Sequence, residues 1–212
     1  MGGDFFWRPG QDNLYVTGEN YFEINGGYVA INANGDGIDI NGTITMSGGT
    51  LIIHGPTSNM NGAIDYLGSF KISGGTLIAT GSSGMAMAPS NNSEQCCVSI
   101  IFQTVQQPGT LVHIRNENGE EMLTFSPDKS YQSLVFSSPE IKRGMSLIIF
   151  TGGSSSGTST DGLYIDGTYT AGTQQYTVLV SDIINYAGTA PVGFPGNMMP
   201  GGNMFPPGGR KR

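Results

Sequence analysis

The sequence is poor in charge, and its few charges are mostly acidic. Only 12% of the 212 residues are charged, with 9 Lys and Arg against 16 Asp and Glu, and the formal net charge is -7. Nucleic-acid binding requires a basic face, so this balance argues against it as the main role. A membrane-spanning helix needs about 18 consecutive apolar residues, and the sequence contains no such run. We therefore expect neither a nucleic-acid partner nor membrane insertion.

Long amphipathic stretches are missing as well. Helices are built from Leu, Ala, Glu and Lys at a period of about 3.6 residues. This chain instead holds 34 glycines, and Ser, Thr and Asn supply most of its polar surface. The composition predicts an all-β fold. A neutral surface of this kind is typical of exported proteins, so we expect an extracellular or cell-surface location, although no secretory leader opens the sequence.

Cysteine is nearly absent, and the two cysteines, Cys96 and Cys97, are adjacent. A disulfide between neighbours closes a strained ring, and a strand would point the two side chains to opposite faces. We predict two unpaired cysteines, one of them buried as a small hydrophobic residue.

What the sequence does contain is an internal repeat. Residues 46–52 match residues 72–78 at an offset of 26, and a weaker copy at 22–29 matches at an offset of 22. A fixed period of about 20 to 50 residues is the signature of a solenoid. Within each copy apolar and polar residues alternate, which indicates strands rather than helices, and a Gly-Gly pair provides a bend.

The repeat predicts that residues 1–95 form rungs of a parallel β-helix. Stacking the copies gives four interior columns: Phe22/Ile44/Phe70, Ile24/Met46/Ile72, Val29/Leu51/Leu77 and Ile31/Ile53/Ala79. A fifth column, Ala30/Ile52/Ile78, points outward. Exposed aliphatic rows attract a partner. We expect the second half of the chain to cover this column, in preference to its being a binding surface.

From Cys96 onward the repeat stops. Short apolar runs separated by turn signals predict an antiparallel β region over 96–186, which caps the helix or forms a small sandwich. The expected strands are 98–102, 110–114, 122–125, 133–136, 147–150 and 176–184, with a hairpin at Asn118-Gly119. The Pro, Gly, Met and Asn-rich segment 187–212 is predicted to be disordered.

The acidic loop 34–39 is the most informative polar motif. One rung apart, Asp39 and Asp65 would lie about 4.8 Å from each other. Their repulsion would be about 3 kcal/mol at a dielectric near 20 and about 1 kcal/mol in water. A calcium ion, completed by Asp36, would offset it. Alternatively, a shared proton or hydrogen bonds to backbone N–H groups would do so, and the aspartates would only cap turns.

Aromatic side chains can bind sugars by stacking on their C–H faces. Tyr66, Tyr28 and Tyr164 are the candidates, and Tyr66 stands next to Asp65. Each could instead be partly buried structure. His54 and His113 have no Ser or Cys nucleophile nearby, and we predict ordinary surface histidines.

Several motifs resemble bacterial carbohydrate-binding domain-containing proteins. The resemblance spans about 21–184 and rests on segments 34–39, 54–58, 62–66, 81–85 and 160–164 together with the paired Ser-Gly-Gly-Thr motifs. It implies an exported surface protein with a right-handed parallel β-helix similar to that of pectate lyases. It also implies bound calcium, with Asp36, Asp39 and Asp65 as the matching acidic positions, and adhesion to cellulose or acidic pectic chains without cleavage. The family's upstream rungs are absent from this chain, and residues 1–20, including Trp7, do not match.

Three functional hypotheses follow. The first is non-catalytic polysaccharide binding on a calcium-stabilised β-helix. The second is a polysaccharide lyase or glycoside hydrolase that uses the aspartate cluster, because paired carboxylates can act as acid and base. The third is a structural surface adhesin. The sequence does not identify the glycan, the number of calcium ions or the oligomeric state.

Overall fold

The computed structural model describes residues 20–170 and 172–189, and this part of the chain is all-β, with no helix. Its strands are β1 (Tyr21–Asn32), β2 (Ile38–Ile40), β3 (Thr43–His54), β4 (Ile64–Tyr66), β5 (Ser69–Ile72), β6 (Thr76–Gly81), β7 (Cys97–Gln106), β8 (Val112–Asn116), β9 (Glu121–Phe125), β10 (Tyr131–Ser137), β11 (Ser146–Thr151), β12 (Ser154–Ser155), β13 (Thr158–Thr160), β14 (Leu163–Ile165), β15 (Tyr169–Thr170), β16 (Thr173–Leu179) and β17 (Ile184–Gly188). No helix in the described residues could cross a membrane. Trp7 and residues 190–212 of the predicted disordered segment lie outside the described residues.

The repeats pair in parallel, in the register that the sequence predicts. β1 pairs with β3 at an offset of 22, and β3 pairs with β5 and β6 at an offset of 26. All four interior columns are formed by these pairings, so their prediction is confirmed. At the bend, Gly49 and Gly75 have positive φ values of 82° and 87°, which glycine adopts without strain.

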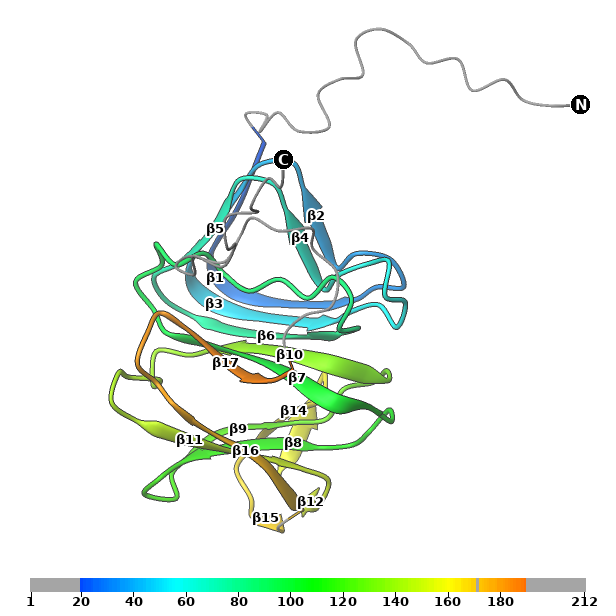
Figure 1. Cartoon of the computed structure of the whole chain (residues 1–212), viewed down its shortest axis with the longest axis vertical. Helices are drawn as coiled ribbons and strands as arrows, with labels where there is room; N and C mark the ends of the chain where they lie inside the picture. The colour runs from blue at the N-terminus through cyan, green and yellow to red at the C-terminus, as the bar shows by residue number, and fades with distance from the viewer. Residues whose placement is uncertain (1–19, 171, 190–212) are drawn as a thin grey trace, which may run out of the picture.

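The repeats surround one apolar core. β2 pairs with β4 in parallel and forms a separate wall, while β1, β3 and β6 lie side by side (Figure 1). The columns fill the space between these walls, and Ile44, Leu51, Phe70 and Leu77 are 0% exposed. Each rung therefore buries its apolar residues against its neighbours.

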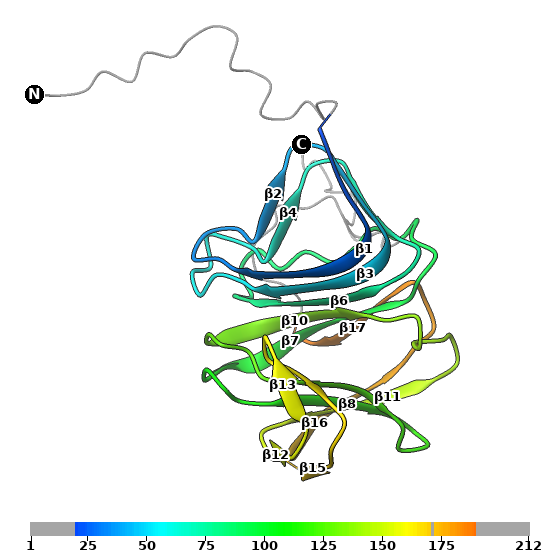
Figure 2. The ribbon, with the colours of Figure 1, turned by 180° about the vertical axis from the view of Figure 1, so that it is seen from behind.

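The sheet of the repeats continues into the second half of the chain. Its order is β1-β3-β6-β10-β7-β17, with β10 antiparallel to both β6 and β7. A second sheet, β13-β14-β9-β8-β11-β16, is antiparallel in all its pairings. The two sheets lie one above the other (Figure 2). The long sheet thus joins the repeats to the region that follows them.

The outward column of the repeats lies between these two sheets. Ile52 and Ile78 are 0% exposed and share one core with residues of both sheets, Val98, Phe136, Val112 and Ile149 among them. Ala30, at the end of the column, is exposed. The prediction that the second half covers this column is confirmed for the two isoleucines.

Cys96 and Cys97 are both free, as predicted, and both are buried, where the sequence predicted burial of one. Cys96 belongs to the core between the two sheets, whereas Cys97 belongs to the core inside the repeats. The alternation of side chains along a strand explains this division. Cys96, directly before β7, and Cys97, the first residue of β7, thus belong to two different cores.

One predicted strand is wrong. The run 176–184 is divided between β16, which pairs with β11 in the second sheet, and β17, which pairs with β7 in the first. The Oδ1 of Asn185 accepts hydrogen bonds from the backbone N–H groups of Ser181 and Asp182 and so stabilises the turn between the two strands. β17 then extends to Gly188, two residues past the predicted end of the region.

Candidate functional site

His54, at the end of β3, connects the repeats to the second half of the chain. Its Nδ1 accepts the backbone N–H of Asp128 at 3.0 Å, and its Nε2 lies 3.0 Å from the carbonyl oxygen of Asp161. Since Nδ1 accepts the N–H of Asp128, Nε2 is the nitrogen placed to donate to the carbonyl oxygen of Asp161. The ring also stacks on Phe125, with centroids 5.3 Å apart. His54 is only 2% exposed, so its prediction as a surface histidine is wrong.

These contacts position the loop between β9 and β10, residues 126–130. Lys129 donates from Nζ to the carbonyl oxygen of Ala33 and to Oδ1 of Asn34, the latter at 3.0 Å. Ser126 donates its N–H to the carbonyl oxygen of Gly162 in the turn between β13 and β14. The loop therefore contacts both the repeats and the β13–β14 hairpin, which is at one end of the second sheet (Figure 2).

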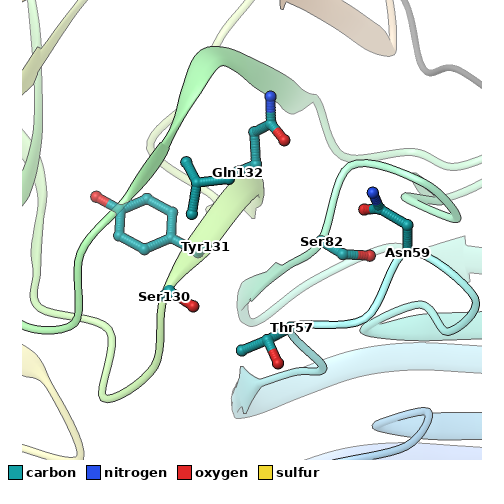
Figure 3. Close-up of a pocket in the computed structure, with 7 residues that line it drawn as sticks. Thr57, Asn59, Ser82, Ser130, Tyr131 and Gln132 are labelled. Atoms are coloured by element: carbon teal, nitrogen blue, oxygen red, sulfur yellow. The ribbon is translucent and has the colours of Figure 1, made fainter.

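Beside this loop lies a small pocket of about 70 Å³. Thr57, Asn59 and Ser82 line one side from the repeats, and the other side consists of residues of β10, of the loop before it and of β7 (Figure 3). The complete lining is Thr57, Asn59, Ser82, Val105, Ser130, Tyr131 and Gln132. Six of these seven residues carry a hydroxyl or amide group, and none is charged. Such a lining can donate and accept hydrogen bonds without a charge to neutralise.

Two side chains of the pocket have their orientation fixed by neighbours. Gln132 donates from Nε2 to the carbonyl oxygen of Phe102 at 3.1 Å and accepts from the hydroxyl of Ser83 at 3.0 Å. Tyr131 donates to the carbonyl oxygen of Thr110 at 2.9 Å. Thr57 and Asn59 are exposed. The fixed side of the pocket therefore faces an open side that a ligand could contact.

The structure separates Tyr66 from Tyr28 and Tyr164, the other two tyrosines predicted to bind sugar. Tyr28 is 47% exposed, and its hydroxyl lies 3.4 Å from the carbonyl oxygen of Thr160 on the β13–β14 hairpin that also carries Tyr164. Burial and the neighbouring Asp161 carboxylate raise the pKa of Tyr28 to about 12. Tyr66 lies elsewhere: its ring packs edge-on against Phe70, and its hydroxyl donates to the carbonyl oxygen of Ala88 at 2.7 Å. These contacts give Tyr66 a structural role.

The aspartate column forms as predicted, since Asp39 and Asp65 are partners in the β2–β4 pair. Burial, and then the charges of Asp36 and Asp39, raise the pKa of Asp65 above its ordinary value. Asp36 is engaged with the next repeat, because its Oδ1 accepts the N–H of Gly62, 26 positions later, at 2.7 Å. Within residues 20–170 and 172–189, no three His, Cys, Asp or Glu side chains are grouped closely enough to hold a metal ion. Calcium at this column stays a prediction.

Replacing Asp65 with Asn is expected to stabilise the metal-free protein by about 1 kcal/mol at pH 7, because one member of the repelling column loses its charge. A raised folded-state pKa means that the charged form of Asp65 lowers stability above that pKa. The advantage of the variant should therefore vanish as the pH falls toward 3.8, the ordinary value. Urea unfolding at several pH values measures it.

The exposed Glu140→Gln variant is the control for removal of a carboxylate outside the column. If calcium binds here, adding it should raise the melting temperature of the wild type more than that of Asp65→Asn. An unchanged melting temperature with calcium or chelator would count against the metal.

His113 is the second buried histidine, and its prediction as a surface residue is also wrong. It is 5% exposed, its ring stacks on Tyr169 with centroids 3.8 Å apart, and its Nδ1 lies 2.8 Å from the hydroxyl of Thr124. Burial, and secondarily the charge of Arg115, lower the pKa of His113 to about 4. Thr124 and Arg115 lie in the second sheet, and Tyr169 lies on β15 of the small β12–β15 sheet, so these contacts assign His113 to the packing between them.

Sequence reasoning missed the pocket because its residues come from segments far apart in the chain. Thr57 lies within the motif 54–58, but nothing in the sequence pairs this motif with residues 130–132. Comparisons with protein-family models, with curated proteins and with solved structures found no match.

Proposed function

We propose that this protein binds a neutral polysaccharide without cleaving it, on a scaffold whose repeats form a right-handed parallel β-helix. The parallel pairings of β1, β3 and β6 and of β2 with β4 support the scaffold. The resemblance to exported carbohydrate-binding proteins supports the ligand class and an extracellular or cell-surface location. Cellulose fits this proposal better than acidic pectic chains, because no residue that lines the pocket is charged.

The uncharged pocket beside the β9–β10 loop is the observation that carries the proposal. A neutral sugar presents hydroxyl groups that must exchange hydrogen bonds with water for hydrogen bonds with protein, since a buried unpaired polar group costs free energy. The exposed hydroxyl of Thr57 and the exposed amide of Asn59 offer both donors and acceptors for them. A uronic-acid carboxylate would find no cationic side chain in the lining.

The pocket size indicates how a sugar would bind. A water molecule occupies about 30 Å³ in the liquid, so a pocket of about 70 Å³ holds one hydroxymethyl or hydroxyl group rather than a pyranose ring. The ring would lie outside, over the exposed Thr57 and Asn59, and the chain would continue along the surface. We expect recognition of one projecting group in each bound segment, and hence weak binding that repeated contacts on a polymer strengthen.

A second cavity is larger, about 280 Å³, but its lining includes Glu94, Lys142 and Arg143. A neutral glycan in that cavity would displace water from charged groups and offer no charge in return. The larger cavity is therefore less suited to a neutral sugar than the smaller uncharged one.

Retention on insoluble cellulose tests the function, and the double variant Thr57→Val/Asn59→Ala tests the site. Loss of about one or two hydrogen bonds, each worth about 1 kcal/mol, should weaken binding about tenfold or more. Isothermal titration with soluble cello-oligosaccharides measures the change. Polygalacturonate in parallel distinguishes neutral from acidic chains.

The matched control is Thr168→Val/Asn92→Ala, which removes the same groups at exposed positions away from the pocket. This control should bind as the wild type does. Equal weakening in both double variants would reject the pocket as the site. A wild-type chain that no glycan retains would reject the function itself, and release of reducing or unsaturated ends would indicate an enzyme instead.

A further inference from the structure

The outer edge of β1 has no strand partner within the described residues. β1 is the terminal strand of the long sheet and pairs only with β3. Natural proteins protect such edges with charged side chains, above all Lys, with Pro, with β-bulges, with short strands or with covering segments. β1 is 12 residues long and contains neither Lys nor Pro; it has one charged residue, Glu23, and one irregularity, at the Gly-Gly bend. Its backbone N–H and C=O groups on this side are therefore free to pair with another strand.

The core of the repeats is also incomplete at this end. In the interior columns, the β3 residues Ile44, Leu51 and Ile53 are 0% exposed. The β1 members of the same columns, Phe22 and Val29, are only partly buried. A further strand stacked on β1 would bury these side chains in the way that β3 buries its own. The edge thus offers both hydrogen bonds and apolar surface.

The sequence of β1 is complementary to itself when reversed about the bond between Gly26 and Gly27. In that antiparallel register the opposed residues are Tyr21 and Asn32, Phe22 and Ile31, Glu23 and Ala30, Ile24 and Val29, and Asn25 and Tyr28. Directly opposed residues point to the same face of a sheet. The inward residues meet apolar partners, Phe22 with Ile31 and Ile24 with Val29, and the only charged residue of β1, Glu23, meets the small Ala30.

The shape of the strand agrees with this register. The β1–β3 pairing is irregular between Ile24 and Tyr28, where the Gly-Gly bend lies. A twofold axis through the bend pairs each arm of β1 in one copy with the other arm of β1 in the second copy. The two Gly-Gly bends then lie side by side. The inward residues of one copy therefore continue the inward columns of the other.

We propose that two copies of this chain form a dimer with twofold symmetry by antiparallel pairing of their β1 edges. The pairing joins the two apolar cores end to end. A twofold contact uses the same surface on both subunits, so it closes at two copies and does not propagate. β10 already occupies the opposite side of the repeats, where it pairs with β6.

Sedimentation equilibrium of the full chain over a range of concentrations tests the dimer, and substitutions at Ala30 test the register. In the dimer, residue 30 of each copy faces Glu23 of the other copy. Ala30→Glu would therefore place an acidic side chain opposite Glu23 at two positions, and Ala30→Lys would place a basic one at both. The first should raise the dissociation constant about tenfold and the second should lower it by a similar factor. Ala30 is exposed, so both variants should fold. Gln103→Glu and Gln103→Lys, at an exposed position on β7, are the matched controls.

Oxidative cross-linking provides an independent test of the register. Glu23→Cys and Ala30→Cys should each fail to cross-link alone and should form a disulfide-linked dimer when mixed, because residue 23 faces residue 30. A wild type that stays monomeric up to about 1 mM would overturn the proposal. So would equal effects of the Ala30 and Gln103 substitutions, or cross-linking of either cysteine variant alone.

Discussion

Replacing His54 with Ala is expected to lower the free energy of unfolding by about 3 kcal/mol, which places it among the severe single substitutions. The imidazole is 2% exposed and bonds through both nitrogens to the backbone of the second half. Its removal leaves the N–H of Asp128 and the carbonyl oxygen of Asp161 without their partner. It also leaves a cavity against Phe125.

His54→Phe separates the two contributions. Phenylalanine keeps an aromatic ring against Phe125 but cannot make either hydrogen bond, so it should recover only the packing part of the loss. Urea unfolding measures both variants, with the exposed Lys71→Ala as a neutral reference. If His54→Phe were as stable as the wild type, the hydrogen bonds between the two halves would contribute nothing, and the interpretation of His54 as their connection would be wrong.

Ile52→Ala is expected to cost about 2 to 5 kcal/mol, the range found when a buried isoleucine is truncated and a cavity remains. Ile52 is 0% exposed, and it lies between the long sheet and the second sheet rather than inside the repeats. The loss therefore reports on packing between the sheets.

Leu179→Ala is the matched control, since Leu179 is an aliphatic residue on β16 that is 59% exposed. It should change the free energy of unfolding by less than about 0.5 kcal/mol. Two coincident unfolding transitions, one followed by tyrosine fluorescence and one by far-ultraviolet circular dichroism, would show that the sheets unfold together. An Ile52→Ala protein as stable as Leu179→Ala would contradict the packing of the second sheet on this column.

The repeat is the part of the fold that sequence reasoning predicts best. Parallel stacking brings equivalent residues of successive copies together, so the offsets of 22 and 26 give the pairings of Ile44 and Leu51 directly. The Asp39 and Asp65 pair follows from the same offset. Periodicity in the sequence becomes proximity in space only where the structure itself repeats.

Outside the repeats the same reasoning reaches individual turns but not their assembly. The hairpin at Asn118-Gly119 is confirmed, with Gly119 at a φ of 86° between β8 and β9. The burial of His54 depends on residues 74 and 107 positions away in the chain, and no local pattern predicts such contacts. The pocket depends on the same contacts, because His54 fixes the loop 126–130, which contributes Ser130 to the lining.

The pairing of β6 with β10 has a consequence for the order in which the chain can fold during synthesis. β6 ends at Gly81, but its partner begins only at Tyr131, and β17, which completes the same sheet, begins at Ile184. On a ribosome the repeats would therefore emerge with the side of β6 unpaired until a long following segment has been made. The nascent repeats have an aggregation-prone edge throughout that interval, and a chaperone that binds exposed strands would act during it.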